Sequence, residues 1–96
     1  MNKIYKYPLS IESETRIFDA IDRFLFVEFQ GNVVCIWAEM DIEKDHVIEP
    51  YVLKVVLTGQ EVPENGIYIG SAQAETAVPG LPFFVVHVYE IYLNDD

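Results

Sequence analysis

The sequence predicts an all-β fold in which six or seven antiparallel strands form a small sandwich or barrel. Segments rich in β-branched and aromatic residues recur along the chain, and turn residues separate them about every ten positions. No segment carries a long helical period of apolar residues, although residues 13–22 leave a short helix or helical turn open. We expect a single β domain over residues 1–93 and a polar tail over residues 94–96.

The first strand is expected over residues 2–9, where apolar side chains alternate along the chain. Pro8 donates no backbone hydrogen bond, which favours an edge position. Residues 11–22 are ambiguous. They fit either an apolar helical stripe or a short strand over residues 15–18 followed by a turn through residues 19–23. A helix this short is marginal unless it packs on something.

The central feature of the sequence is a predicted β-hairpin over residues 24–40. Two apolar runs meet at Gly31 and Asn32, and both of these residue types tolerate the positive φ of tight hairpin turns. Neither run alternates cleanly, so apolar side chains fall on both faces of each strand. We therefore expect a central hairpin with both faces covered, its outer face meeting a second sheet, a loop or another copy of the chain.

Two further segments follow the hairpin. Residues 41–49 carry four acids and one lysine, and they form a polar connection that Pro50 ends. Residues 51–58 alternate strongly, with Tyr51 and every second residue after it expected to face inward.

The C-terminal part is expected to add two strands. Residues 66–72 form a short strand in which Gly70 indicates a bulge or a close backbone approach. Residues 73–82 contain small residues and two prolines, and we expect a mobile loop that could become ordered on binding. Residues 83–93 are nearly all apolar, so this strand is expected to lie centrally, beside the hairpin.

The composition indicates surplus apolar surface. Hydrophobic residues make up 51% of only 96 residues, and aromatic residues make up 14%. A chain of this length buries a limited share of its surface, and apolar area that does not fit inside tends to be buried between subunits. We therefore expect a homo-oligomer, with a dimer favoured.

The charge of the chain limits its partners. A formal charge of -10 repels nucleic acids and anionic membranes, because binding to phosphates needs clustered Lys and Arg. A single cysteine, Cys35, cannot form an internal disulfide, and no apolar N-terminal stretch resembles a signal peptide. We expect a cytoplasmic protein with no direct nucleic-acid or membrane partner.

Five segments carry a family resemblance: IYKYPL, VEFQGNVVCIWAEMD, VVLTGQEVP, YIGSAQ and FFVVHVYE. Together they resemble a family of short β-rich proteins with no assigned activity that are encoded mostly by tailed bacteriophages and prophages. The resemblance covers residues 3–90 and implies a phage setting, the host cytoplasm and a compact β fold. In the family, the segment matching residues 15–23 usually holds a Pro-Gly turn between two strands, and this favours a strand in that segment. This chain has Asp19 to Asp22 in place of the Pro-Gly pair, so a helical turn there stays an alternative.

No catalytic, cofactor-binding or metal site is evident, and we expect no enzyme activity and no cofactor. His87 lies between valines, as a hydrogen-bonded structural histidine would, and Ser71 shows no His/Asp pairing in the sequence. Alternating carboxylates stand where the hairpin ends, but no glycine provides the bend of a calcium loop. These carboxylates are Glu39, Asp41, Glu43 and Asp45.

Three functional hypotheses follow. The first is a phage accessory protein that binds a host protein, such as a nucleic-acid-handling defence enzyme, through the acidic residues Glu39, Asp41, Glu43, Asp45, Glu61 and Glu64. The second is a binder that sequesters a nucleotide-like signal in a pocket of Trp37, Tyr68, His87, Arg16 and Arg23. It requires cations to converge, with Lys54 as a further candidate. The third is a structural or assembly component of the phage.

Overall fold

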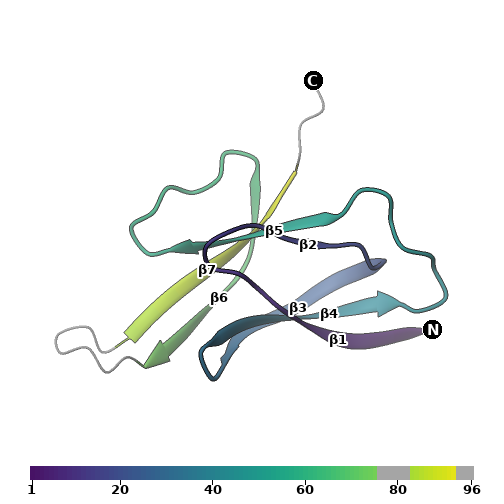
Figure 1. The fold of residues 1–96 in the computed structure, drawn as a ribbon, viewed down its shortest axis with the longest axis horizontal. Helices are drawn as coiled ribbons and strands as arrows, with labels where there is room; N and C mark the ends of the chain where they lie inside the picture. Colours follow the sequence, from purple (N-terminus) through teal and green to yellow (C-terminus); the bar gives the residue numbers. More distant parts are fainter. Residues whose placement is uncertain (76–82, 93–96) are drawn as a thin grey trace.

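The computed structural model describes residues 1–75 and 83–92, which form seven antiparallel strands in two sheets and contain no helix (Figure 1). The predicted all-β class is therefore confirmed. The helical alternative for residues 13–22 is wrong, since a short strand and the start of the next occupy that segment. The strands are β1 (Asn2–Pro8), β2 (Thr15–Ile17), β3 (Ile21–Gln30), β4 (Val33–Asp41), β5 (Tyr51–Leu57), β6 (Gly66–Glu75) and β7 (Phe83–Ile91).

The first sheet has the strand order β1-β4-β3, with β1 at the edge that Pro8 predicted. The hairpin of β3 and β4 forms as expected, and Gly31 adopts a φ of 60° at its turn. Two register shifts interrupt β3, one between Ile21 and Arg23 and one between Phe24 and Phe26. β3 therefore begins at Ile21, where the sequence indicated a turn. The bulges allow this because they keep both Ile21 and Phe24 against the core.

The second sheet has the order β2-β5-β7-β6. β7 is central, as its apolar sequence predicted, but it lies between β5 and β6, so its predicted place beside the hairpin is wrong. Residues 58–62 of the β5–β6 loop fold over its outer face and border a groove of about 240 Å³ that reaches His87 and Tyr89. The side chains on the outer face of β7 are therefore partly covered by a loop of the same sheet. β7 does not need the hairpin beside it to bury them.

β6 is longer than predicted and holds the expected irregularity at Gly70. The register shifts between Tyr68 and Gly70, and a Cβ at Gly70 would lie 3.4 Å from Cγ2 of Val27. Both a bulge and a close approach are thus present. Residues 73–75 of the predicted loop belong to β6, whereas residues 76–82 and the polar tail lie outside the described residues.

The core lies between the two sheets. Its most deeply buried side chains come from β4, β5 and β7, and they are Val34, Ile36, Leu53, Val86 and Val88. The other face of the three-stranded sheet is largely uncovered, since Ile4, Phe26 and Val33 are 59%, 48% and 45% exposed. Within the described part of the single chain, neither a second sheet nor a loop covers this face, and cover by another copy of the chain stays a prediction. Among the described residues, no helix is long and apolar enough to span a membrane.

Candidate partner-binding surface

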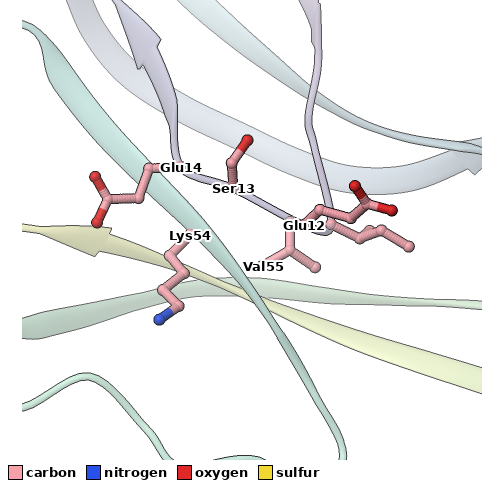
Figure 2. A pocket seen from close by; sticks show the side chains of 6 residues that line it. Glu12, Ser13, Glu14, Lys54 and Val55 are labelled. Atoms are coloured by element: carbon pink, nitrogen blue, oxygen red, sulfur yellow. The ribbon is translucent and has the colours of Figure 1, made fainter.

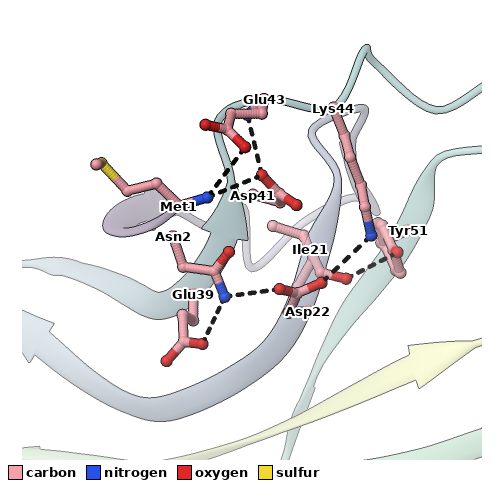
Figure 3. A network of polar contacts seen from close by, with 9 residues as sticks. All are labelled: Met1, Asn2, Ile21, Asp22, Glu39, Asp41, Glu43, Lys44 and Tyr51. Carbon is pink, nitrogen blue, oxygen red and sulfur yellow. Dashed lines mark hydrogen bonds and ion pairs between the residues drawn. The ribbon is translucent and has the colours of Figure 1, made fainter.

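One end of the three-stranded sheet carries a network of carboxylates (Figure 3). Asn2 Nδ2 donates hydrogen bonds to Asp22 Oδ2 at 2.7 Å and to Glu39 Oε2 at 2.8 Å. Arg23 adds an ion pair to Glu39 at 3.3 Å. The bond from Asn2 and the charge of Arg23 hold the pKa of Glu39 below its ordinary value. Glu39 is thus engaged within its own chain.

The N-terminal amine binds two more of these carboxylates. It lies 3.8 Å from Asp41 Oδ1 and 3.3 Å from Glu43 Oε2. Asp41 Oδ1 also accepts a hydrogen bond from the backbone N–H of Glu43 at 3.0 Å. Asp41 therefore shapes the start of the β4–β5 connection, and reversing its charge would disturb the chain itself. Of the predicted partner-binding residues, Glu39 and Asp41 serve mainly the local structure.

The β4–β5 connection, residues 42–50, is fixed at several points and still presents an apolar side chain to solvent. The backbone N–H of Val47 donates to the carbonyl of Phe18 at 2.8 Å, and His46 lies 3.6 Å from Asp19. Next to this anchor Ile48 is 96% exposed. Its acidic neighbours Glu43, Asp45 and Glu49 are exposed as well. We call residues 42–50 the acidic connection.

The acidic residues predicted from sequence do not form one surface. Asp45 lies in the acidic connection that precedes β5, whereas Glu61 and Glu64 lie in the loop that follows β5 (Figure 1). The two loops stand at opposite ends of that strand. Of these two loops, the acidic connection presents the more exposed apolar side chain, since Ile48 is 96% and Val62 is 57% exposed.

The structure also separates the five residues of the predicted ligand pocket. Trp37 and Arg23 belong to the three-stranded sheet, where Trp37 stacks on Phe26 with ring centroids 4.5 Å apart. Tyr68, His87 and Arg16 belong to the four-stranded sheet. The predicted pocket residues are therefore divided between the two sheets, and of the five only Tyr68 and His87 share a hydrogen-bond partner, Ser71.

The cations do not converge either. Lys54 lines a pocket of about 260 Å³ together with Glu12 and Glu14 (Figure 2). Arg16 pairs with Glu14 at 3.8 Å, and Arg23 lies in the other sheet. Two carboxylates beside one ammonium disfavour a phosphate, which needs converging positive charge. This arrangement argues against a nucleotide-like ligand.

A hydrogen-bonded network that the sequence did not reveal lies on the four-stranded sheet. His87 Nδ1 lies 2.7 Å from Ser71 Oγ, His87 Nε2 lies 3.1 Å from Thr58 Oγ1, and Tyr68 Oη lies 2.6 Å from Ser71 Oγ. Ser71 and His87 are cross-strand partners, but this register depends on the bulge before Gly70. Both ring nitrogens of His87 are engaged, as expected for a structural histidine, and the network ties the β5–β6 loop to β6 and β7.

Two antiparallel sheets around one core, with an acidic loop at one end, define a small β-sandwich protein. The chain belongs to the family described as Domain of unknown function (DUF7352), which matches residues 1–95. No curated protein and no solved structure matches the chain. Among the described residues, no group of three or more His, Cys, Asp or Glu side chains is placed to hold a metal ion.

Proposed function

We propose that this protein is a phage-encoded accessory protein that acts in the host cytoplasm by binding a basic host protein through the acidic connection. The observation that carries the proposal is Ile48, which is 96% exposed within a loop that backbone hydrogen bonds hold in place. Leaving such a side chain in water gains nothing for folding, since its burial is favourable by about 2 kcal/mol. Binding of a partner that covers Ile48 would gain that free energy.

The chemistry of the acidic connection favours a partner with positive charge around an apolar pocket. Ile48 provides an apolar anchor, and the exposed acidic residues Glu43, Asp45 and Glu49 lie in the same loop. Interfaces commonly combine such an apolar centre with a polar rim. Rim charges mainly accelerate association, so binding should weaken as salt is added.

Anti-defence activity is the role we propose for this contact. Enzymes that handle nucleic acids present clustered Lys and Arg to phosphates, and an acidic surface complements them. The formal charge of -10 favours approach to such a surface. In this proposal the protein works by occupying its partner and carries out no covalent chemistry.

The test is quantitative affinity capture from infected-host lysate, comparing the wild-type chain with Ile48→Asp and with Asp45→Lys. Ile67→Asp, which alters a 52% exposed isoleucine on β6, is the control for the first variant. Glu64→Lys, in the loop at the other end of β5, is the control for the second.

We expect one host protein to be retained by the wild-type chain and by both controls, and to be reduced about fivefold or more by each acidic-connection variant. Loss of a central apolar contact costs more than about 1 kcal/mol, and a reversed rim charge opposes the approach of a basic partner. Retention should also fall between low and physiological salt. Equal retention by all five proteins would refute the proposed surface. A partner lost only with Glu64→Lys would move the site to the β5–β6 loop.

A further inference from the structure

The uncovered face of the three-stranded sheet has an aromatic centre. Phe26 and Trp37 lie side by side in register on β3 and β4, their rings stacked within 5° of parallel. Lys6 completes this row from β1. The exposed side chains of Ile4 and Val33 extend the apolar surface on either side. We call the row of Lys6, Trp37 and Phe26 the central row.

Opposite charges flank the central row on β3. Arg23 lies on one side of it, in register with Glu39, and Glu28 lies on the other side, in register with Cys35. Both side chains are exposed, and no ion pair of Glu28 occurs among the described residues. A second copy of the chain can be placed on this face by rotating the first copy by 180° about an axis along the central row. The rotation exchanges the two sides of the row, so that Glu28 of one copy faces Arg23 of the other.

The same rotation matches a second set of charges. Lys6 Nζ donates a hydrogen bond to Gln30 Oε1 at 2.6 Å, so its ammonium group lies toward the hairpin end of the sheet. The carboxylates of Asp22 and Glu39 gather at the opposite end. When the two ends exchange, each ammonium group faces the carboxylates of the other copy. The face is thus complementary to itself in charge.

We propose that two copies of the chain pack face to face through this surface, related by a two-fold axis along the central row. The stacked aromatic rings of the two copies meet at the axis, and Glu28 pairs with Arg23 across it. Two sheets that pack in this way keep their strands nearly aligned, about 10 Å apart. Lys44 of the acidic connection lies 4.0 Å from Asp22 and so borders this interface, but none of the charge pairs proposed across the axis uses a residue of that connection.

The size of the face indicates a moderate affinity. Three strands spaced about 4.8 Å apart, each rising about 3.3 Å per residue, provide roughly 400 Å² per copy. This area, about 800 Å² for both copies together, is below the standard size of stable interfaces and fits a weak, transient contact. We therefore expect a dimer with a dissociation constant in the range of about 1 to 100 μM, as seen for weak specific contacts.

The experiment is sedimentation equilibrium of the full chain at several concentrations and two salt concentrations. Glu28→Arg and Arg23→Glu are measured separately and then together, because the double variant restores the opposite charges across the axis. Phe26→Ser removes the exposed aromatic ring at the axis, and Ile67→Ser is its control on β6. Circular dichroism checks that each variant is folded.

We expect each single charge reversal and Phe26→Ser to weaken dimerisation about tenfold or more, and the double reversal to recover most of the loss, since like charges across an interface are strongly unfavourable. Ile67→Ser should dimerise as the wild-type chain does. A chain that stays monomeric throughout, a dimer indifferent to Phe26→Ser, or a double reversal without recovery would each overturn the proposed packing. None of these outcomes bears on capture through Ile48.

Discussion

Tyr7 shows at the scale of a residue how a polar group is accommodated beside the core. Its hydroxyl donates a hydrogen bond to Asp19 Oδ2 at 2.7 Å and lies 3.6 Å from the sulfur of Met40. Burial and then the hydrogen bond to Asp19 raise the pKa of Tyr7 well above its ordinary value. The bond joins β1 to the segment between β2 and β3, twelve residues further along the chain.

Tyr7→Phe should lower the free energy of unfolding by about 1 to 2 kcal/mol, because it removes a hydrogen bond to a carboxylate that remains partly buried. Urea denaturation at neutral pH measures the loss. Tyr5→Phe is the control, since Tyr5 lies on the same strand and is exposed. Equal stability of the two variants would show that the Tyr7 bond contributes nothing.

The raised pKa of Tyr7 also predicts an alkaline limit to stability. A group whose pKa is higher in the folded state than in the unfolded state contributes stability that is complete below the unfolded value, near pH 10, and is lost as the pH rises toward the folded one. Absorbance at about 295 nm should therefore show a tyrosine that ionises well above the ordinary pKa, and this late step should be missing in Tyr7→Phe. Identical titration curves would contradict the assignment.

At the scale of an element, the bulge in β6 determines how closely the two sheets approach. Gly70 lies opposite Val27 of β3, and a Cβ there would be at van der Waals distance from Cγ2 of Val27. The strand pattern predicted a bulge or a close approach at Gly70. It could not predict that the contacting residue is Val27, because β3 is remote in sequence and belongs to the other sheet.

Gly70→Leu should lower the free energy of unfolding by about 1 to 3 kcal/mol, since the added atoms overfill the contact with Val27. The double variant Gly70→Leu/Val27→Ala should cost less than the sum of its two single variants, because the smaller residue vacates the space. A double-mutant cycle by chemical denaturation measures this coupling. Additive losses would show that the two side chains do not meet.

At the scale of the whole molecule, the structure distinguishes two faces of β4 that the sequence presents as equally apolar. Ile36 is fully buried between the sheets, whereas its neighbour Trp37 stacks on Phe26 at the uncovered face. Large-to-small substitution in a core leaves a cavity, but truncation at an open face does not. The larger side chain is therefore not the more important one for folding.

Ile36→Ala should lower the free energy of unfolding by about 2 to 5 kcal/mol. Trp37→Ala should cost less, about 1 to 2 kcal/mol, from the lost ring stacking and partial burial. Denaturation at a protein concentration well below about 1 μM keeps the proposed dimer from contributing to either value. The opposite order of the two losses would place Trp37 in the core.

The sequence by itself determined the all-β class and the approximate place of most strands, the edge position of β1 and the irregularity at Gly70, because these features follow from side-chain period, from proline and from glycine. The tertiary structure alone decided which apolar face is buried. It also decided that β7 pairs with β5 and β6, and that the predicted acidic and pocket residues are dispersed. Pairing between remote strands and the bulges in β3 and β6 set these outcomes, and a bulge changes the direction of a side chain without changing the composition of its strand.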